Sequence, residues 1–220
     1  MPVAGVLFDV DGTLVDTTFL HAVCWWQAFR QSDFDVPMAV IHRSIGMGGE
    51  HLVANSLGER AESADLDALS AAHDALYSAY WPQLRLLPGA ARLLRHCHDA
   101  GLRVVLASSA KEREVGVLRR VLNCDDVIDV VTTASDADSS KPAPDLVQVA
   151  LGKADLSPDD AVFVGDAVWD VEASGRAGVS CVGVESGGTS AAELREAGAV
   201  QSYRDCAELL AHFATSPLAG

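Results

Sequence analysis

The chain lacks paired cysteines and has few basic residues. Its 220 residues include five scattered cysteines with no C-x-x-C pair, so neither a disulfide framework nor a zinc site is indicated. Sixteen basic residues against thirty-one acidic ones give a net charge of −15, which opposes binding to nucleic acid or to an anionic membrane surface. These shortages favour a small-molecule substrate over a polyanionic partner.

Long apolar runs are also missing. The sequence has no stretch of about 18 apolar residues, as a membrane-spanning helix would need, and its first residues lack the basic-then-apolar pattern of a secretory signal. We therefore expect a cytoplasmic protein, a monomer or a homodimer, with no membrane partner. Its length suits one α/β domain, or a core of about 150 residues that carries a smaller insert.

The most informative segment is a buried-strand pattern that runs directly into two acids. The apolar residues 6–8 precede the sequence DVDGT, which places Asp9 and Asp11 before Gly12. Apolar residues followed by glycine indicate a core strand and its turn, so both acids are expected at the carboxyl end of the strand, where open α/β sheets bind ligands. Two close carboxylates repel each other unless a cation intervenes, so the motif predicts a hard metal such as Mg²⁺.

Two simpler interpretations of this motif exist. An EF-hand loop also carries acids at alternate positions, but it needs glycine at its sixth place and a helix in front, whereas Gly12 is fourth and a strand precedes it. A solvated turn is the other alternative, because aspartate and glycine are common turn residues.

Residues 16–86 show helical patterns and no evident strand. The first helix of this segment places four side chains on one face: Phe19, Val23, Trp26 and Arg30. Another helix is expected over residues 65–80, and turns are expected near Pro37, at residues 46–49 and near Pro82. The segment is therefore expected to be all-helical.

From Pro88 onward, strand and helix patterns alternate, which is typical of βαβ units and a parallel sheet. Strands are expected near residues 102–107, 127–131, 161–165, 179–184 and 199–202, with helices that start near residues 111, 142, 169, 190 and 205. The predicted fold class is α/β: a doubly wound, Rossmann-like parallel sheet in a core domain (residues 1–15 and 87–220), with an all-helical cap domain (residues 16–86) inserted into it.

Three further polar sites fall at expected strand ends or just beyond them. Ser108 and Ser109 precede a helix and offer hydroxyl and backbone N–H groups to a phosphate oxygen, although a helix N-cap is the common role of such serines. Lys141 is held extended by Pro142, so it is positioned to neutralise phosphate charge, and a solvated lysine is its alternative role. Asp166 ends the fourth strand, and Asp170 follows one helical turn later. Asp166 offers a further oxygen ligand for Mg²⁺, and an N-cap is its alternative role.

These motifs, in this order, resemble those of the haloacid dehalogenase-like hydrolase superfamily. The matching residues are the DVDGT sequence at 9–13, Ser108, Lys141, and Gly165-Asp166 with Asp170. The resemblance extends over roughly residues 3–202. The helical insert between the first two motifs is similar to that of the subgroup that includes phosphoglycolate phosphatase and β-phosphoglucomutase.

The resemblance implies Mg²⁺-dependent hydrolysis of a small phosphate monoester, phosphoglycolate-like or sugar-phosphate-like, through an aspartyl-phosphate intermediate. Asp9 would attack phosphorus, and Asp11 would act as the general acid and base. Mg²⁺ would be held by the carboxylates of Asp9 and Asp166 and by the backbone carbonyl of Asp11. Ser108 and Lys141 would bind the transferring phosphoryl group. Supporting roles fall to Gly12, Thr13 and Asp170.

Single residues distinguish this chain from superfamily members that catalyse other reactions. Dehalogenases lack the second acid, which is present here as Asp11. Phosphonoacetaldehyde hydrolase needs a cap lysine, and no lysine precedes Lys111. A β-phosphoglucomutase-type isomerase stays open, although Thr13 resembles the phosphatase pattern more than the mutase pattern.

Substrate choice is expected to reside in the loop of the cap around residues 42–49. Its glycines, Gly48 among them, permit close backbone approach, and His42 or Arg43 could meet a second anionic group on the substrate. A solvated helix end is the alternative role of these two basic residues.

Two non-enzymatic functions are also conceivable. A phosphorylatable receiver domain has its phosphoacceptor on the third strand, but here that strand is followed by Thr132 and Thr133. An inactive ligand-binding domain conflicts with the fact that every acid of the motifs is intact.

Overall fold

Six parallel strands form one sheet in the order β3-β2-β1-β4-β5-β6. The computed structural model describes residues 3–219, so Met1, Pro2 and Gly220 of the expected core lie outside the described residues. β1 lies at the centre of the sheet, where Leu7 pairs with Val105 of β2 on one side and with Phe163 of β4 on the other. The strands are β1 (Gly5–Phe8), β2 (Arg103–Ala107), β3 (Val130–Thr132), β4 (Ala161–Gly165), β5 (Ser180–Val184) and β6 (Gln201–Tyr203).

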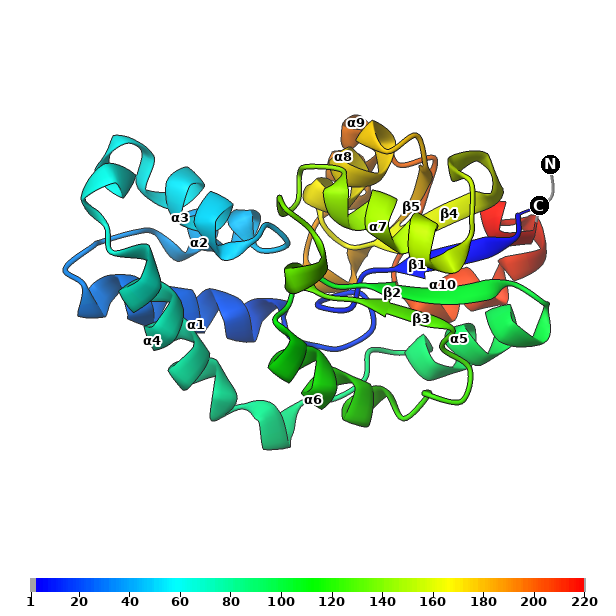
Figure 1. Cartoon of the computed structure of the whole chain (residues 1–220), viewed down its shortest axis with the longest axis horizontal. Helices are drawn as coiled ribbons and strands as arrows, with labels where there is room; N and C mark the ends of the chain where they lie inside the picture. The colour runs from blue at the N-terminus through cyan, green and yellow to red at the C-terminus, as the bar shows by residue number, and fades with distance from the viewer. Residues whose placement is uncertain (1–2, 220) are drawn as a thin grey trace.

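Helices cover both faces of this sheet (Figure 1). The strands are apolar on both sides, as buried parallel strands need to be. In β1, Val6 and Phe8 point into one cluster with α5 (Ala90–Asp99), α6 (Glu112–Leu122) and α10 (Cys206–Ala211). Leu7 points the other way, into a cluster with three further helices: α7 (Asp145–Ala154), α8 (Val168–Arg176) and α9 (Ala191–Ala197). This architecture confirms the predicted doubly wound α/β fold.

The helical segment between β1 and α5 has its own apolar core. Its helices are α1 (Thr18–Gln31), α2 (Met38–Ser44), α3 (Gly49–Leu57) and α4 (Leu66–Ser78). Trp25, Ile41, Leu52 and Leu69 of these helices are buried together. In Figure 1 this helical lobe stands to one side of the sheet. We call it the cap and the remainder the core.

The chain leaves and re-enters the core through two adjacent segments. The Asp16 amide donates to the Arg85 carbonyl at 3.0 Å, and the Leu87 amide donates to the Leu14 carbonyl at 2.9 Å. The first connection of the sheet therefore opens into the cap and closes again at one place, directly beyond the motif that begins at Asp9.

The buried face of α1 differs from the face that the apolar spacing favours. Phe19 is 57% exposed, whereas Trp25 and Phe29, which point in other directions from the helix, are buried. The reason is the position of α4, because its residue His73 stacks on the Trp25 ring with the ring centroids 4.5 Å apart. In residues 3–219, no helix is both long and apolar enough to cross a membrane.

Candidate active site

A buried lysine joins two of the predicted acids beyond the central strands. Asp9 directly follows β1, and its backbone amide donates to the Val164 carbonyl of β4 at 2.9 Å. Lys141 is 0% exposed, and its Nζ atom donates to Asp9 Oδ1 at 2.6 Å and to Asp170 Oδ1 at 2.7 Å. A fully buried ammonium needs such partners, because its desolvation is otherwise uncompensated. The three residues therefore form one rigid unit.

Asp9, Asp166 and Asp170 bring three buried carboxylates within 4.8 Å of one another. Asp166 accepts a hydrogen bond from the Thr13 hydroxyl at 2.9 Å, and Asp170 Oδ2 accepts one from the Ala167 amide at 3.0 Å. The Lys141 ammonium pairs with Asp9 and Asp170, and no basic side chain among residues 3–219 pairs with Asp166. The group consists of oxygen donors alone, which are the ligands that hard cations prefer.

Two carboxylates of this group, those of Asp9 and Asp166, resist ionisation. Burial raises the pKa of Asp9 to about 7, because burial together with the charges of Asp170 and Asp11 outweighs the attraction of Lys141. Burial, with the charges of Asp170 and Asp9, also raises the pKa of Asp166 well above its usual range. A divalent cation would remove this mutual repulsion. The acidic cluster therefore fits a metal ion.

Two glycines leave room around Asp166. A Cβ atom on Gly12, whose φ is +83°, would lie 2.5 Å from Asp166 Oδ2, and a Cβ atom on Gly187 would lie 1.6 Å from the same oxygen. Gly12 belongs to the loop after β1, and Gly187 to the 3-10 turn Glu185–Gly187 after β5. Both backbones therefore approach this carboxylate as closely as only glycine allows.

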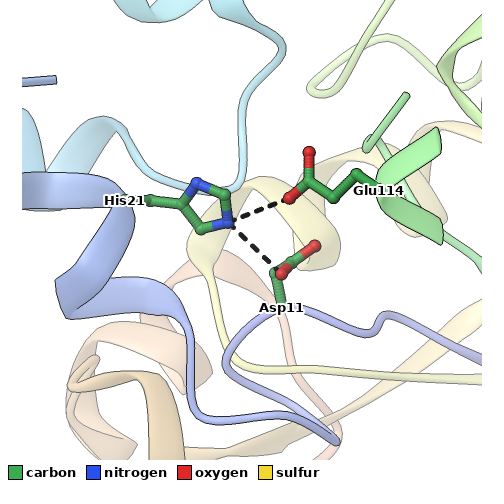
Figure 2. Close-up of side chains that lie close together, drawn as sticks. All are labelled: Asp11, His21 and Glu114. Carbon is green, nitrogen blue, oxygen red and sulfur yellow. Dashed lines mark hydrogen bonds and ion pairs between the residues drawn. The ribbon is translucent and has the colours of Figure 1, made fainter. Parts of the chain in front are cut away.

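Asp11 lies at the boundary between core and cap, where His21 of α1 reaches it (Figure 2). Its Oδ1 atom accepts from the Thr17 hydroxyl at 2.7 Å and lies 3.3 Å from Nε2 of His21. The same Nε2 atom lies 3.3 Å from Oε1 of Glu114 on α6. One histidine of the cap thus bridges two acids of the core.

The charges of this trio are set by the contacts. Burial opposes the ionisation of Asp11, but its hydrogen bond to His21 and the charge of that ring outweigh burial and lower its pKa. Burial likewise opposes the charge on His21, but Asp11 and Glu114 raise its pKa to about 10. His21 is therefore an imidazolium at neutral pH.

A second histidine extends this network across the cap. His21 Nδ1 lies 3.0 Å from His73 Nε2, and His73 Nδ1 lies 3.2 Å from Asp74 Oδ1. Asp74 Oδ2 accepts from Lys111 of the core at 2.6 Å. One proton arrangement satisfies every contact: a cationic His21 donates to a neutral His73, which donates to Asp74.

The neutral His73 predicts a pH-dependent stability. Burial, with the nearby charge of His21, lowers the pKa of His73 to about 4, whereas the pKa of a histidine in an unfolded chain is about 6.5. Between these values the unfolded chain binds more protons, so stabilisation present above pH 6.5 is lost as pH falls towards 4. We expect the wild-type free energy of unfolding, minus that of His73→Gln, to decrease by roughly 1 to 2 kcal/mol from pH 7 to pH 5.

Urea unfolding of both proteins at pH 5, 6 and 7 measures this difference. Groups that do not contact His73 have the same surroundings in both proteins, so their contributions cancel in the subtraction. A difference that stays constant over this range would show that His73 is not held neutral.

The two predicted phosphate-binding serines lie at the end of β2. Ser108 is 0% exposed, and its Oγ atom accepts from the Ala110 amide at 3.1 Å. The Ser109 Oγ atom is buried and has no hydrogen-bond partner within the described chain. Lys141 Nζ also approaches the Ala107 carbonyl at 3.4 Å, so lysine and serines meet at the end of one strand. The unpaired hydroxyl of Ser109 is free to bind a ligand.

A cavity of about 460 Å³ opens on Asp9, Asp11 and Ser109 and extends between core and cap. Gly48 lines it as well, and a Cβ atom on Gly48 would lie 2.2 Å from Ser140 Oγ of the core. His42 and Arg43 line a different cavity, of about 320 Å³, which Asp166 and Gly187 also line. The three predicted specificity residues are therefore divided between two cavities.

Four residues of the site lie outside the motifs identified in the sequence: His21, His73, Glu114 and Gly187. His21 had a weak signal, because it falls one turn into a helix that begins directly after the Asp9 motif. Glu114 and Gly187 had none, since each reaches the site through folding of a distant segment. Trp25 also lines the cavity, although sequence alone favours a packing role for it.

Comparisons with known proteins define the class of protein. A family profile described as haloacid dehalogenase-like hydrolase matches residues 3–178. A hydrolase structure from Pseudomonas syringae is 31% identical, with a TM-score of 0.89, and the match covers 96% of this chain and 98% of that one. The chain therefore belongs to the haloacid dehalogenase-like hydrolase family, which confirms the resemblance seen in its motifs.

Two members of that family with named activities are similar to this chain in sequence. The β-phosphoglucomutase of Bacillus subtilis is 29% identical over 194 residues, which cover 83% of each chain. The phosphoglycolate phosphatase of Pseudomonas putida is 28% identical over 188 residues, which cover 83% of this chain and 69% of the relative. The chain is thus similar both to a phosphatase and to a mutase.

Proposed function

We propose that this protein is a Mg²⁺-dependent phosphatase that hydrolyses a small phosphate monoester through an aspartyl-phosphate intermediate. The observation that carries the proposal is the unit of Asp9, Lys141 and Asp170 beneath a cavity that Asp11 also lines. The substrate is a small phosphorylated metabolite of the phosphoglycolate or sugar-phosphate kind. The protein acts in the cytoplasm as a monomer or a homodimer, with residues 16–86 as its cap domain.

Asp9 is the nucleophile in this proposal. Its carboxylate attacks phosphorus, the bond from phosphorus to the ester oxygen breaks, and the alcohol departs. The Lys141 ammonium and the hydroxyls of Ser108 and Ser109 stabilise the charge on the phosphoryl oxygens. Because Asp170 holds Lys141 at 2.7 Å, the ammonium stays in place when Asp9 Oδ1 turns to the phosphoryl group. Asp170 is thus a positioning residue.

Asp11 carries the protons of the cycle. Ionised beside His21, it can accept a proton from the water that attacks the aspartyl phosphate, which releases inorganic phosphate and restores Asp9. The same proton then passes to the oxygen of the departing alcohol in the next turnover. His21 and Thr17 support this role because their hydrogen bonds orient the Asp11 carboxylate.

The acidic cluster supports a Mg²⁺ ion as cofactor. Asp9 and Asp166 would hold it with their carboxylates, and Asp11 with its backbone carbonyl. When bound, the ion supplies positive charge to the phosphoryl oxygens. Thr13 contributes by orienting Asp166 at 2.9 Å, and Gly12 contributes by leaving space beside that carboxylate.

A mutase is the second candidate, because one relative bears the name β-phosphoglucomutase. It would use the same nucleophile and the same acid and base. In that case Asp9 would pass its phosphoryl group to another hydroxyl of a sugar phosphate instead of to water.

Phosphate release with and without Mg²⁺ tests the proposal. The substrates are p-nitrophenyl phosphate, phosphoglycolate, sugar phosphates, nucleotides and β-glucose 1-phosphate, with Asp9→Asn as the blank. We expect Mg²⁺-dependent release that the variant lacks. No release, together with conversion of β-glucose 1-phosphate to glucose 6-phosphate, would replace the phosphatase with the mutase.

Gly187 provides a sharper test of the metal site. In Gly187→Ala the new methyl group would overlap Asp166 Oδ2, so that this carboxylate must move. We expect kcat to fall by about 10²-fold, as a displacement of about 1 Å at a reacting centre can cause, and the Mg²⁺ concentration for half-maximal activity to rise. Activity at a series of Mg²⁺ concentrations measures both.

Gly152→Ala is the matched control, because Gly152 lies within α7 and a Cβ atom there meets no atom within 4 Å. This variant should keep its activity and gain about 0.5 to 1 kcal/mol of stability. Unchanged kcat and Mg²⁺ dependence in Gly187→Ala would mean that neither Mg²⁺ binding nor turnover depends on the position of Asp166.

A further inference from the structure

The wall of the 460 Å³ cavity is acidic and apolar. Beyond Asp9 and Asp11, five acids line it: Glu50, Asp67, Asp74, Glu114 and Asp138. Three of these, Glu50, Asp67 and Asp138, are exposed at its rim. Five apolar side chains line the part formed by the cap: Trp25, Ile45, Met47, Leu52 and Leu66. A bound leaving group therefore meets carboxylates and apolar surface.

The basic residues that line this cavity already have partners. Lys111 is paired with Asp74 at 2.6 Å, and His21 lies between Asp11 and Glu114, 3.3 Å from each. His73 has both ring nitrogens occupied, by His21 and by Asp74. Among residues 3–219, no arginine lines the cavity. A second anionic group on a substrate would find no unpaired cation there.

The two basic residues of the cap loop are engaged elsewhere. Arg43 forms an ion pair with Glu193, and its carbonyl accepts from Trp169 Nε1 at 2.9 Å. His42 Nε2 lies 3.0 Å from the Gly187 carbonyl, and its ring stacks on Phe19 with the centroids 4.6 Å apart. Both side chains therefore hold the cap against the core, outside the cavity that contains Asp9.

We infer that the substrate carries no second anionic group: it is the phosphate monoester of an uncharged or amine-bearing alcohol. This inference rests on the proposed phosphatase function and narrows its substrate class. Hydroxyl or ammonium groups can donate hydrogen bonds to lining carboxylates that form no ion pair among residues 3–219, those of Glu50, Asp67 and Asp138, and an apolar face can pack on Trp25. A carboxylate or second phosphate would instead face like charges in a partly desolvated space.

The lack of an unpaired cation in the cavity also argues against the mutase function. Transfer of the phosphoryl group from Asp9 to a hydroxyl of a sugar phosphate produces a sugar bisphosphate. Its second phosphate would have to lie in the remainder of the cavity, whose lining carries five further acids. Attack by water produces only inorganic phosphate, which the site of Lys141 and Ser109 can release.

Matched substrates test the inference. 2-Aminoethyl phosphate, 2-hydroxyethyl phosphate and phosphoglycolate have two-carbon leaving groups that differ in charge. We expect kcat/KM for phosphoglycolate to be at least about tenfold below that of either of the others at low ionic strength, and the gap to narrow as salt is added. The same order is expected for glucosamine 6-phosphate, glucose 6-phosphate and 6-phosphogluconate.

Charge reversal at the rim gives a second readout. Asp67→Lys places a cation at the mouth of the cavity and should raise the ratio of kcat/KM for phosphoglycolate to that for 2-hydroxyethyl phosphate by about three- to tenfold. Asp159→Lys makes the same change in net charge at an exposed position before β4, away from the carboxyl ends of the strands, and should leave the ratio unchanged. An unchanged ratio in Asp67→Lys would contradict the inference.

The outcomes separate this inference from the proposed function. If p-nitrophenyl phosphate and all six esters show no release that depends on both Mg²⁺ and Asp9, the phosphatase function fails and the inference with it. If phosphoglycolate equals or exceeds 2-hydroxyethyl phosphate in kcat/KM while Asp9→Asn is inactive, the inference is overturned and the phosphatase stands.

Discussion

Asp9→Asn is expected to lower kcat for phosphate release by about 10⁴-fold or more while the protein stays folded, as removal of a catalytic nucleophile does in other enzymes. Asparagine keeps a carbonyl oxygen that can accept the hydrogen bond of Lys141, now 2.6 Å from Asp9 Oδ1. It cannot form the acyl phosphate. The loss should therefore appear in kcat on every substrate, and thermal unfolding should remain cooperative.

Asp16→Asn is the matched control, because Asp16 is exposed and lies seven residues further along the same segment. It removes the same charge, and activity should be retained. Wild-type turnover in a purified Asp9→Asn protein would rule out nucleophilic attack by this residue, whatever the substrate.

Lys141→Met should damage both activity and stability. Methionine has a similar length but no charge, so Asp9 and Asp170 lose their shared partner inside the core. Removal of one partner from a buried charge pair costs about 3 to 5 kcal/mol. Loss of a donor to the phosphoryl oxygens should lower kcat by about 10²- to 10³-fold. Urea unfolding in the presence of a chelator and single-substrate kinetics measure the two effects.

Lys153→Met provides the comparison for a surface pair. Lys153 is paired with Asp136, but its side chain is 43% exposed, so the change should cost about 1 kcal/mol or less. The deficit of Lys141→Met should shrink as pH falls below about 7, because protonation of Asp9 removes the repulsion that the lysine compensates. Equal losses of stability in the two variants would mean that the buried pair contributes no more than a surface one.

The architecture of the core could be predicted because the central strands are apolar on both faces. β1 and β4 have fully buried patterns, and each ends directly at an acid, so the strand ends and Asp9 and Asp166 followed from one observation. The strand expected near residues 127–131 proved to be Val130–Thr132. Val127 belongs to a turn, in which its amide donates to the Cys124 carbonyl. A buried valine in a turn has the same local signal as one in a strand.

The network around Asp11 could not be predicted, because it depends on how the cap packs on the core. His21 and Glu114 are 93 residues apart, one on a helix of the cap and the other on a helix of the core, yet their side chains lie 3.3 Å apart. Local pattern shows that each lies on a helix. Local pattern does not show that the first turn of α1 faces α6, because the relative position of the two helices follows from tertiary packing.

The cap loop shows the same limit for charged residues. The positions of His42 and Arg43 near the glycines favoured contact with a substrate, but both lie in the last turn of α2 and contact residues that follow β5. Gly48, only five residues beyond Arg43, lines the cavity with Asp9. α2 ends at Ser44, between Arg43 and Gly48, and sequence alone does not indicate which of these two residues faces the site.

The stereochemical course at phosphorus tests the aspartyl-phosphate mechanism most directly. A phosphate monoester made chiral at phosphorus with oxygen isotopes is hydrolysed by the wild-type protein in isotopically labelled water, and the configuration of the product phosphate is determined. Attack by Asp9 followed by attack by water comprises two in-line displacements, so we predict overall retention of configuration. Inversion would show that water attacks the ester in a single step and would contradict a covalent role for Asp9.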